Sequence, residues 1–133
     1  MVVVYKWGGI AFDDKSLIKT LILPSIARDD NPITFHDNGV DYQVPVGKVF
    51  IVGHFVNIGT TTDAWVGRAG ESDGADGAIT RDVAQVEIEA DVKSNSKDVL
   101  GVYTAGKYVT AESDTNTTGP QQYSTLYGVE IDA

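Results

Sequence analysis

The pentapeptide Gly70-Glu71-Ser72-Asp73-Gly74 has the spacing of a nucleophile elbow, in which a serine is exposed on a sharp turn between a strand and a helix. That chemistry needs a helix after the serine and, in α/β-hydrolases, a histidine later in the chain. Here a glycine-rich stretch follows, and both histidines, His36 and His54, precede the serine. The sequence therefore predicts a chance match and no catalytic residue.

Three carboxylates alternate with apolar residues in a second candidate site, at Glu87, Glu89 and Asp91. Neighbours on one strand face lie roughly 6.5 to 7 Å apart, close to the separation of the two carboxyls in glycosidases. The stretch is similar in outline to the acidic strand of β-sandwich glucan hydrolases. It departs from their Glu-x-Asp pattern, and only Trp7 and Trp65 could line a cleft. We interpret it as a solvated strand face and expect a protein that is not an enzyme; loss of glucan hydrolysis in Glu87→Gln would contradict this.

The weak candidates for a metal site are Glu71, Asp73 and Asp76, since calcium takes six to eight oxygen ligands from flexible loops. Their spacing matches neither the EF-hand nor the nonapeptide calcium repeat. No second histidine lies at ligand spacing from His54. We therefore expect no metal and no cofactor.

Length and charge narrow the function classes further. A chain of 133 residues is enough for one domain, and the absence of cysteine excludes thiol catalysis and thiolate zinc sites. The net charge of −9 opposes binding to phosphate backbones and anionic lipids. The sequence thus predicts neither a nucleic-acid nor a membrane partner.

The residue inventory is typical of an all-β protein. Val, Ile, Thr and the aromatic residues supply 51 of 133 residues, against five leucines. Turn signals include Asn38-Gly39, the expected tip of a hairpin, and Pro24, which indicates a sheet edge or bulge. The segment Ala69 to Gly77 is expected to be a loop.

We predict one antiparallel β-sandwich over residues 1–133, specifically an eight-stranded jelly roll, with 1–32 as a less regular N-terminal arm. The expected strands, eight to nine in number, are Val2–Trp7, Ile33–His36, Val40–Val44, Lys48–Ile58, Thr62–Gly67, Val83–Val92, Val99–Thr104, Lys107–Thr110 and Tyr123–Ile131, and Lys19–Ile26 is an apolar stretch interrupted by Pro24.

The stretch from Lys48 to Ile58 is apolar on both faces, which predicts a strand covered on both sides. A two-layer sandwich covers only one face, so the other must meet the arm or a second subunit. The predicted core comprises Val49, Ile51, Phe55, Trp65, Val86, Ile88, Val102, Tyr127 and Val129. The predicted oligomer interface comprises Phe50, Val52, His54, Val56 and Ile58. We expect a symmetric homo-oligomer, a homotrimer, with the arm covering its own sheet as the alternative.

The run Tyr42-Gln43-Val44-Pro45-Val46-Gly47-Lys48-Val49-Phe50-Ile51-Val52 resembles the opening of strands in small jelly-roll domains on tailed-virus particles, such as capsid decoration (cement) proteins and receptor-binding heads. The run covers about a tenth of the chain. The resemblance implies a jelly roll that trimerises on a virion, binds a major capsid protein and performs no chemistry. It carries no functional residue over to this chain.

A carbohydrate-binding module or lectin-like receptor-binding domain is the alternative function. Such a protein would stack exposed aromatic side chains on sugar rings. The candidates in this chain are Tyr5, Trp7, Tyr103 and Tyr108. A glycan-array signal that is lost in Trp7→Ala or Tyr108→Ala would favour this alternative.

Overall fold

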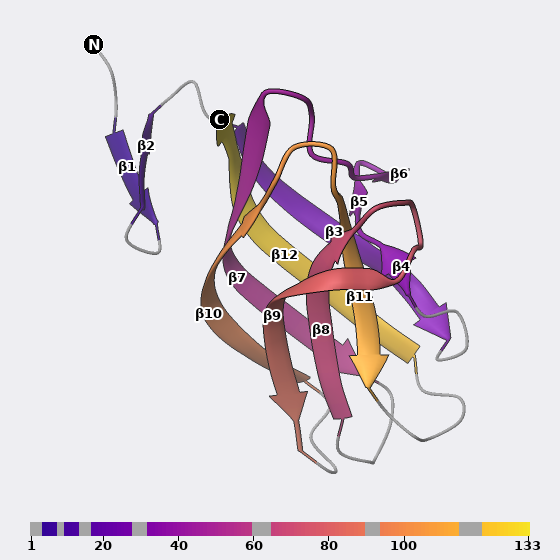
Figure 1. Ribbon diagram of the computed structural model, residues 1–133. Helices are drawn as coiled ribbons and strands as arrows, with labels where there is room; N and C mark the ends of the chain where they lie inside the picture. Colours follow the sequence, from indigo (N-terminus) through magenta and orange to yellow (C-terminus); the bar gives the residue numbers. More distant parts are fainter. Residues whose placement is uncertain are drawn as a thin grey trace.

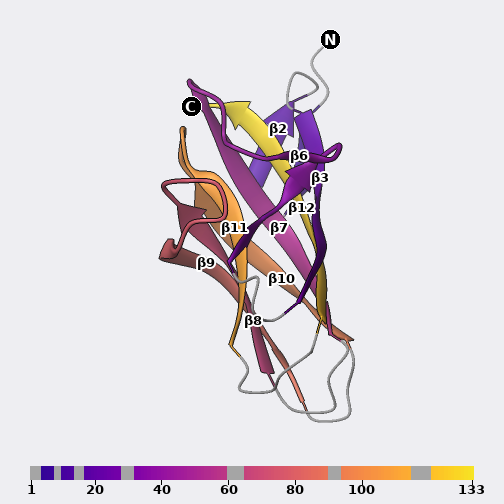
Figure 2. The ribbon, with the colours of Figure 1, turned by 90° about the vertical axis from the view of Figure 1, so that its right-hand side faces the viewer.

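The computed structural model describes residues 4–7, 10–13, 17–27, 32–59, 65–89, 94–114 and 121–133. This part of the chain is all-β, and two antiparallel sheets pack face to face as a sandwich (Figures 1 and 2). Among the described residues there is no helix long and apolar enough to span a membrane. The strands are β1 (Val4–Trp7), β2 (Ile10–Asp13), β3 (Leu17–Ala27), β4 (Ile33–Thr34), β5 (His36–Asp37), β6 (Val40–Asp41), β7 (Lys48–Gly59), β8 (Trp65–Ser72), β9 (Ile79–Ile88), β10 (Ser94–Tyr103), β11 (Tyr108–Asp114) and β12 (Gln121–Asp132).

The strand order shows nested pairing between the start and the end of the chain. The larger sheet has the order β10-β7-β12-β3-β5-β6, and the smaller has β4-β11-β8-β9. Thus β3 pairs with β12, β4 with β11, β7 with β10, and β8 with β9. Strands β1 and β2 form a separate hairpin, which projects from the end of the sandwich near the C-terminus (Figure 1). The all-β sandwich expected from composition is confirmed.

Two local turn signals are confirmed. Asn38 and Gly39 have φ values of 51° and 82°, and they join the paired strands β5 and β6. Positive φ at both central residues is the signature of a type I′ hairpin turn. Leu23 of β3 pairs with Ser124 of β12, and Ile26 pairs with Gln122. Two residues of β3, Pro24 and Ser25, therefore stand against one residue of β12, so Pro24 lies at a bulge.

The faces of β7 differ from the prediction because the strand contains a bulge at Gly53. Tyr127 of β12 pairs with His54, and the next residue, Gly128, pairs with Val52. Gly53 therefore has no partner on β12 and is the extra residue of the bulge. The side-chain alternation therefore shifts by one position. Phe50, Val52 and Phe55 all point into the core and are fully buried.

The predicted division of β7 into a core face and an interface face is consequently wrong. Phe50 and Val52, expected at an oligomer interface, belong to the core. Register places His54 on the opposite side of the sheet, beside Ile51. We call this side of the six-stranded sheet the outer face. Its described positions on the four long strands include Thr20, Ile22, Val49, Ile51, His54, Val56, Ser96, Asp98, Leu100, Val102, Thr125, Tyr127, Val129 and Ile131.

The predicted core is partly confirmed. Phe55 and Val86 are buried between the sheets, whereas Ile51 and Val129 are buried on the outer face. Val102 and Tyr127 were predicted to be core residues, and both are exposed on the outer face. Val49 is only half-buried there, and the side chains of Trp65 and Ile88 lie outside the described residues. Burial in the observed core is greatest for Leu21, Leu23, Phe35, Val44, Phe50, Val52, Phe55, Tyr103, Val109 and Leu126.

Two predicted boundaries are also corrected. Residues 17–27 form the regular strand β3, paired along its length with β12, so the arm outside the sandwich is shorter than 1–32. Residues Ala69 to Ser72, predicted as loop, continue strand β8. A Cβ on Gly70 would lie 2.5 Å from the Arg81 carbonyl oxygen, so this glycine permits close strand packing.

Candidate functional site

Ser72 of the elbow-like pentapeptide ends a strand and is buried. Its hydroxyl donates to the Gly74 carbonyl at 2.8 Å and lies 2.7 Å from the Thr110 hydroxyl. Bends and turns, not a helix, follow it. The hydroxyl thus has a structural environment, without the strand–turn–helix geometry that exposes a nucleophile.

The three candidate metal ligands do not converge. Asp73 pairs with Lys107 on the surface. Asp76 accepts a hydrogen bond from the Thr34 backbone N–H at 2.8 Å. Glu71 points into the sandwich, and within the described part of the chain no group of three or more potential ligand side chains could hold a metal ion.

Glu71 instead forms an ion-pair clamp between the sheets, in which its own carboxylate is buried and the Arg81 side chain is half exposed. Its Oε1 accepts from Arg81 Nε at 2.5 Å, and Arg81 Nη2 also pairs with this oxygen. Its Oε2 accepts from the Thr104 hydroxyl at 2.9 Å. Arg81 Nη2 also donates to the Val102 carbonyl. The clamp joins β8 and β9 of one sheet to the end of β10 in the other.

A second buried carboxylate, Glu130, accepts a hydrogen bond from the Tyr42 hydroxyl at 2.7 Å. Burial, and then this hydrogen bond, raise the pKa of Tyr42 well above its usual value. Burial also raises the pKa of Tyr103, whose hydroxyl has no hydrogen-bond partner among the described residues. Tyr103, a candidate for sugar stacking, is therefore a core residue.

We expect the two tyrosines to respond differently to replacement by phenylalanine. Tyr42→Phe leaves the Glu130 carboxylate without its donor and should cost about 1 to 3 kcal/mol at pH 7, whereas Tyr103→Phe should be neutral or stabilising. The pKa values of both tyrosines in the folded protein lie above the unfolded value of about 10, so the folded state favours the neutral phenol of each. Each tyrosine therefore lowers the free energy of unfolding progressively as the pH rises above about 10, and has no such effect below that pH. Tyr103→Phe should remove about 1.4 kcal/mol per pH unit of that alkaline loss. Urea unfolding at pH 7, 10 and 11 tests this; a larger loss at pH 7 in Tyr103→Phe than in Tyr42→Phe would contradict it.

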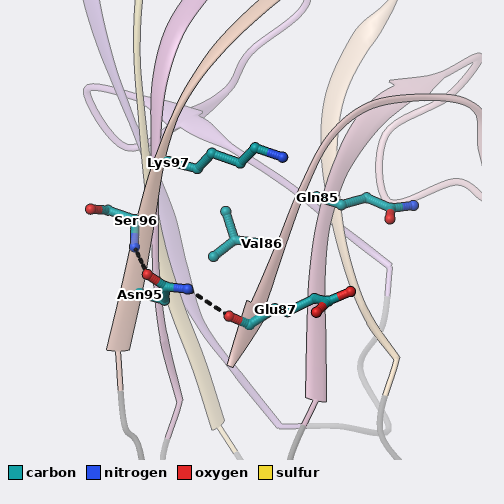
Figure 3. A pocket seen from close by; sticks show the side chains of 6 residues that line it. All are labelled: Gln85, Val86, Glu87, Asn95, Ser96 and Lys97. Carbon is teal, nitrogen blue, oxygen red and sulfur yellow. Dashed lines mark hydrogen bonds between the residues drawn. The ribbon is translucent and has the colours of Figure 1, made fainter. Parts of the chain in front are cut away.

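A shallow groove lies between the edge strands β9 and β10 (Figure 3). Val86 points into it and Lys97 extends across it. Asn95 donates to the Glu87 carbonyl oxygen at 2.8 Å. The Glu87 carboxylate points away from the groove, and Glu87 and Glu89 are both exposed, as predicted for a solvated strand face. Asp91 lies outside the described residues.

The outer face of the six-stranded sheet is the most distinctive surface. Its central residues Ile51 and Val129 are buried. Around them are four large exposed side chains: Ile22 (56% exposed), Leu100 (60%), Val102 (39%) and Tyr127 (39%). They come from three strands, β3, β10 and β12. Large exposed apolar side chains gathered on one face of a sheet make this face a candidate interaction surface.

Both histidines of the chain lie on this outer face, and each is paired with an aspartate. His54 Nδ1 lies 2.7 Å from Asp98 Oδ1. His36, opposite Ile22 in the register, has its Nε2 3.0 Å from Asp41 Oδ1. Among the described outer-face positions, these two pairs are the charged groups. The described outer face thus carries two of the 19 acidic residues of the chain, Asp41 and Asp98.

The sequence pointed to a second apolar face but assigned the wrong residues to it. Of the five predicted interface residues, His54 and Val56 lie on the outer face, and the side chain of Ile58 lies outside the described residues. The residues missed were Ile22, Leu100, Val102 and Tyr127. No protein-family model matches the chain, and neither does any curated protein.

Proposed function

We propose that this protein is a non-enzymatic structural protein that associates with itself through the outer face, as a homotrimer, and stabilises a larger assembly. The observation that carries the proposal is the exposed apolar surface on a chain with a net charge of −9. Copies with that charge repel one another over most of their surface, so an apolar face with few acidic residues is the favourable place for contact.

The size of the outer face supports a stable contact. It is built on four adjacent strands of 10 to 12 residues. With about 4.8 Å between strands and 3.3 Å per residue, four ten-residue strands cover roughly 19 by 33 Å, or about 630 Å². A standard protein–protein interface buries about 800 Å² on each partner.

Capsid decoration is the role that we propose for this oligomer. The nested pairing, in which β3 pairs with β12 and β4 with β11, supports the interpretation of the sandwich as an eight-stranded jelly roll. Viral capsid and lectin domains use this architecture. The run from Tyr42 to Val52 supports the virion setting by its resemblance. A major capsid gene beside the gene for this protein is the expected genomic context. A polysaccharide-utilisation cluster there would favour the lectin alternative, against which the burial of Tyr103 argues.

Leu100→Glu is expected to weaken self-association by about 100-fold or more, because a carboxylate would be buried in the interface without a partner. The matched control is Val46→Glu. Val46 is another exposed aliphatic residue, 94% exposed, and lies in the turn before β7. Light scattering and sedimentation at micromolar concentration should give a trimer for the wild type and the control. A soluble, strictly monomeric wild type would refute the proposed self-association.

A further inference from the structure

The N-terminal hairpin is separate from both sheets of the sandwich in the part of the chain that the structure describes. Among the described strands, β1 and β2 pair with each other and form their own two-stranded sheet. Among the described elements, β1 and β2 contact each other much more than either contacts a strand of the sandwich. An isolated two-stranded hairpin is marginally stable in water and needs a surface to pack against.

The hairpin register gives it one apolar and one polar face. Tyr5 is opposite Phe12, and Trp7 is opposite Ile10. Directly opposed residues share a face, and so do residues two apart along a strand. These four large apolar positions therefore share one face, while the other carries the opposed pairs of Val4 with Asp13 and Lys6 with Ala11.

We propose that the apolar face of this hairpin docks on the outer face of the neighbouring copy in the oligomer. The inference rests on the self-association proposed above and names the surfaces that meet. The three aromatic residues alone can bury about 450 to 750 Å², at 150 to 250 Å² each. That area approaches the roughly 800 Å² per partner of a standard interface.

Exchange of hairpins also fits a closed ring of three copies. A contact between hairpin and outer face is heterologous, because it joins two different surfaces of the same chain. Each copy then donates one hairpin and receives one, and a heterologous contact closes into a ring when its rotation allows. The short connection of residues 14–16 ties the hairpin to β3, which itself belongs to the receiving sheet. In each copy, the donated hairpin and the receiving outer face are therefore directly linked along the chain.

Disulfide trapping tests the proposal on a clean background, since the chain has no cysteine. Trp7→Cys and Tyr127→Cys are expressed separately as full-length chains, one of them isotopically labelled, and the two chains are then mixed in denaturant and refolded together. After oxidation, we expect a mixed disulfide between labelled and unlabelled chains, identified by mass spectrometry. Leu100→Cys serves as a second acceptor on the outer face, in case Tyr127→Cys does not fold.

Two matched controls define the background of random capture. Lys6→Cys lies on the opposite face of the hairpin from Trp7, and Val46→Cys lies in the turn before β7. We expect each control pair to give at least about tenfold less mixed disulfide than Trp7→Cys with Tyr127→Cys. Equal yields in the controls would overturn the proposal.

The remaining outcomes separate this inference from the proposed function. A chain carrying both cysteines that forms only an internal disulfide would show that the hairpin covers its own sheet, and the exchange would be wrong. A stable trimer that gives no hairpin cross-link would also overturn the exchange, while self-association would stand. A monomeric wild type would overturn both.

Discussion

Gly128→Ala is expected to lower the free energy of unfolding by about 3 kcal/mol or more, at the upper end of the cost of overpacking a core. Gly128 lies on β12 opposite Val52 and is buried. A Cβ at this position would clash with Phe50 Cζ and would lie 2.5 Å from the Ile51 carbonyl oxygen. The ring cannot turn away easily, because Phe50 packs between Tyr42 and Tyr103 at centroid distances of 5.4 and 5.8 Å. The backbone oxygen belongs to the central strand β7, so relief would require the two paired strands to separate.

Urea unfolding monitored by circular dichroism measures this loss, and Gly74→Ala is the matched control. A Cβ on Gly74 would meet no atom within 4 Å, so we expect little change in stability. Gly128→Ala with wild-type stability would mean that β12 and Phe50 are less tightly packed than their geometry indicates.

The sequence was sufficient where a local signal determines the local structure. Asn38-Gly39 predicts a tight hairpin turn because both residues tolerate positive φ, and that turn is present. The alternation around Val86 correctly gave one buried and one wet face, because only one of the two faces is apolar. The all-β sandwich follows from many such segments acting together.

The assignment of faces on β7 failed because both faces are apolar, so alternation alone does not tell which one meets the opposite sheet. The deciding feature is the bulge at Gly53, which shifts every later side chain to the other face. A glycine inside an apolar strand is a known indication of a bulge, so the signal was present in the sequence. The same ambiguity placed Tyr127, an outer-face residue, in the predicted core.

The buried polar contacts were beyond sequence reasoning for a different reason. Glu71 lies in a glycine-rich stretch that reads as a loop, and its partners include Thr104, 33 positions away. Tyr42 and Glu130 are 88 positions apart. Only the nested strand pairing brings such groups together, and a single sequence contains no local pattern for it.

Arg81→Met should lower the free energy of unfolding by about 3 to 5 kcal/mol, because it leaves the Glu71 carboxylate buried without its cation. Glu71 is 3% exposed, and after the substitution it keeps only the hydrogen bonds from Thr104. The Val102 carbonyl would also lose its donor from Arg81. The melting temperature should fall by more than about 10 °C, as measured by calorimetry.

The double variant Arg81→Met with Glu71→Gln should recover most of this loss, because removing both charges leaves no unpaired charge inside the sandwich. Lys107→Met is the matched control, since its ion pair with Asp73 lies on the surface, where solvent screens it, and we expect little change. The double variant also separates the effect of an unpaired buried carboxylate from simple loss of side-chain packing at position 81. If it were no more stable than Arg81→Met alone, the unpaired Glu71 carboxylate would not be the cause of the loss.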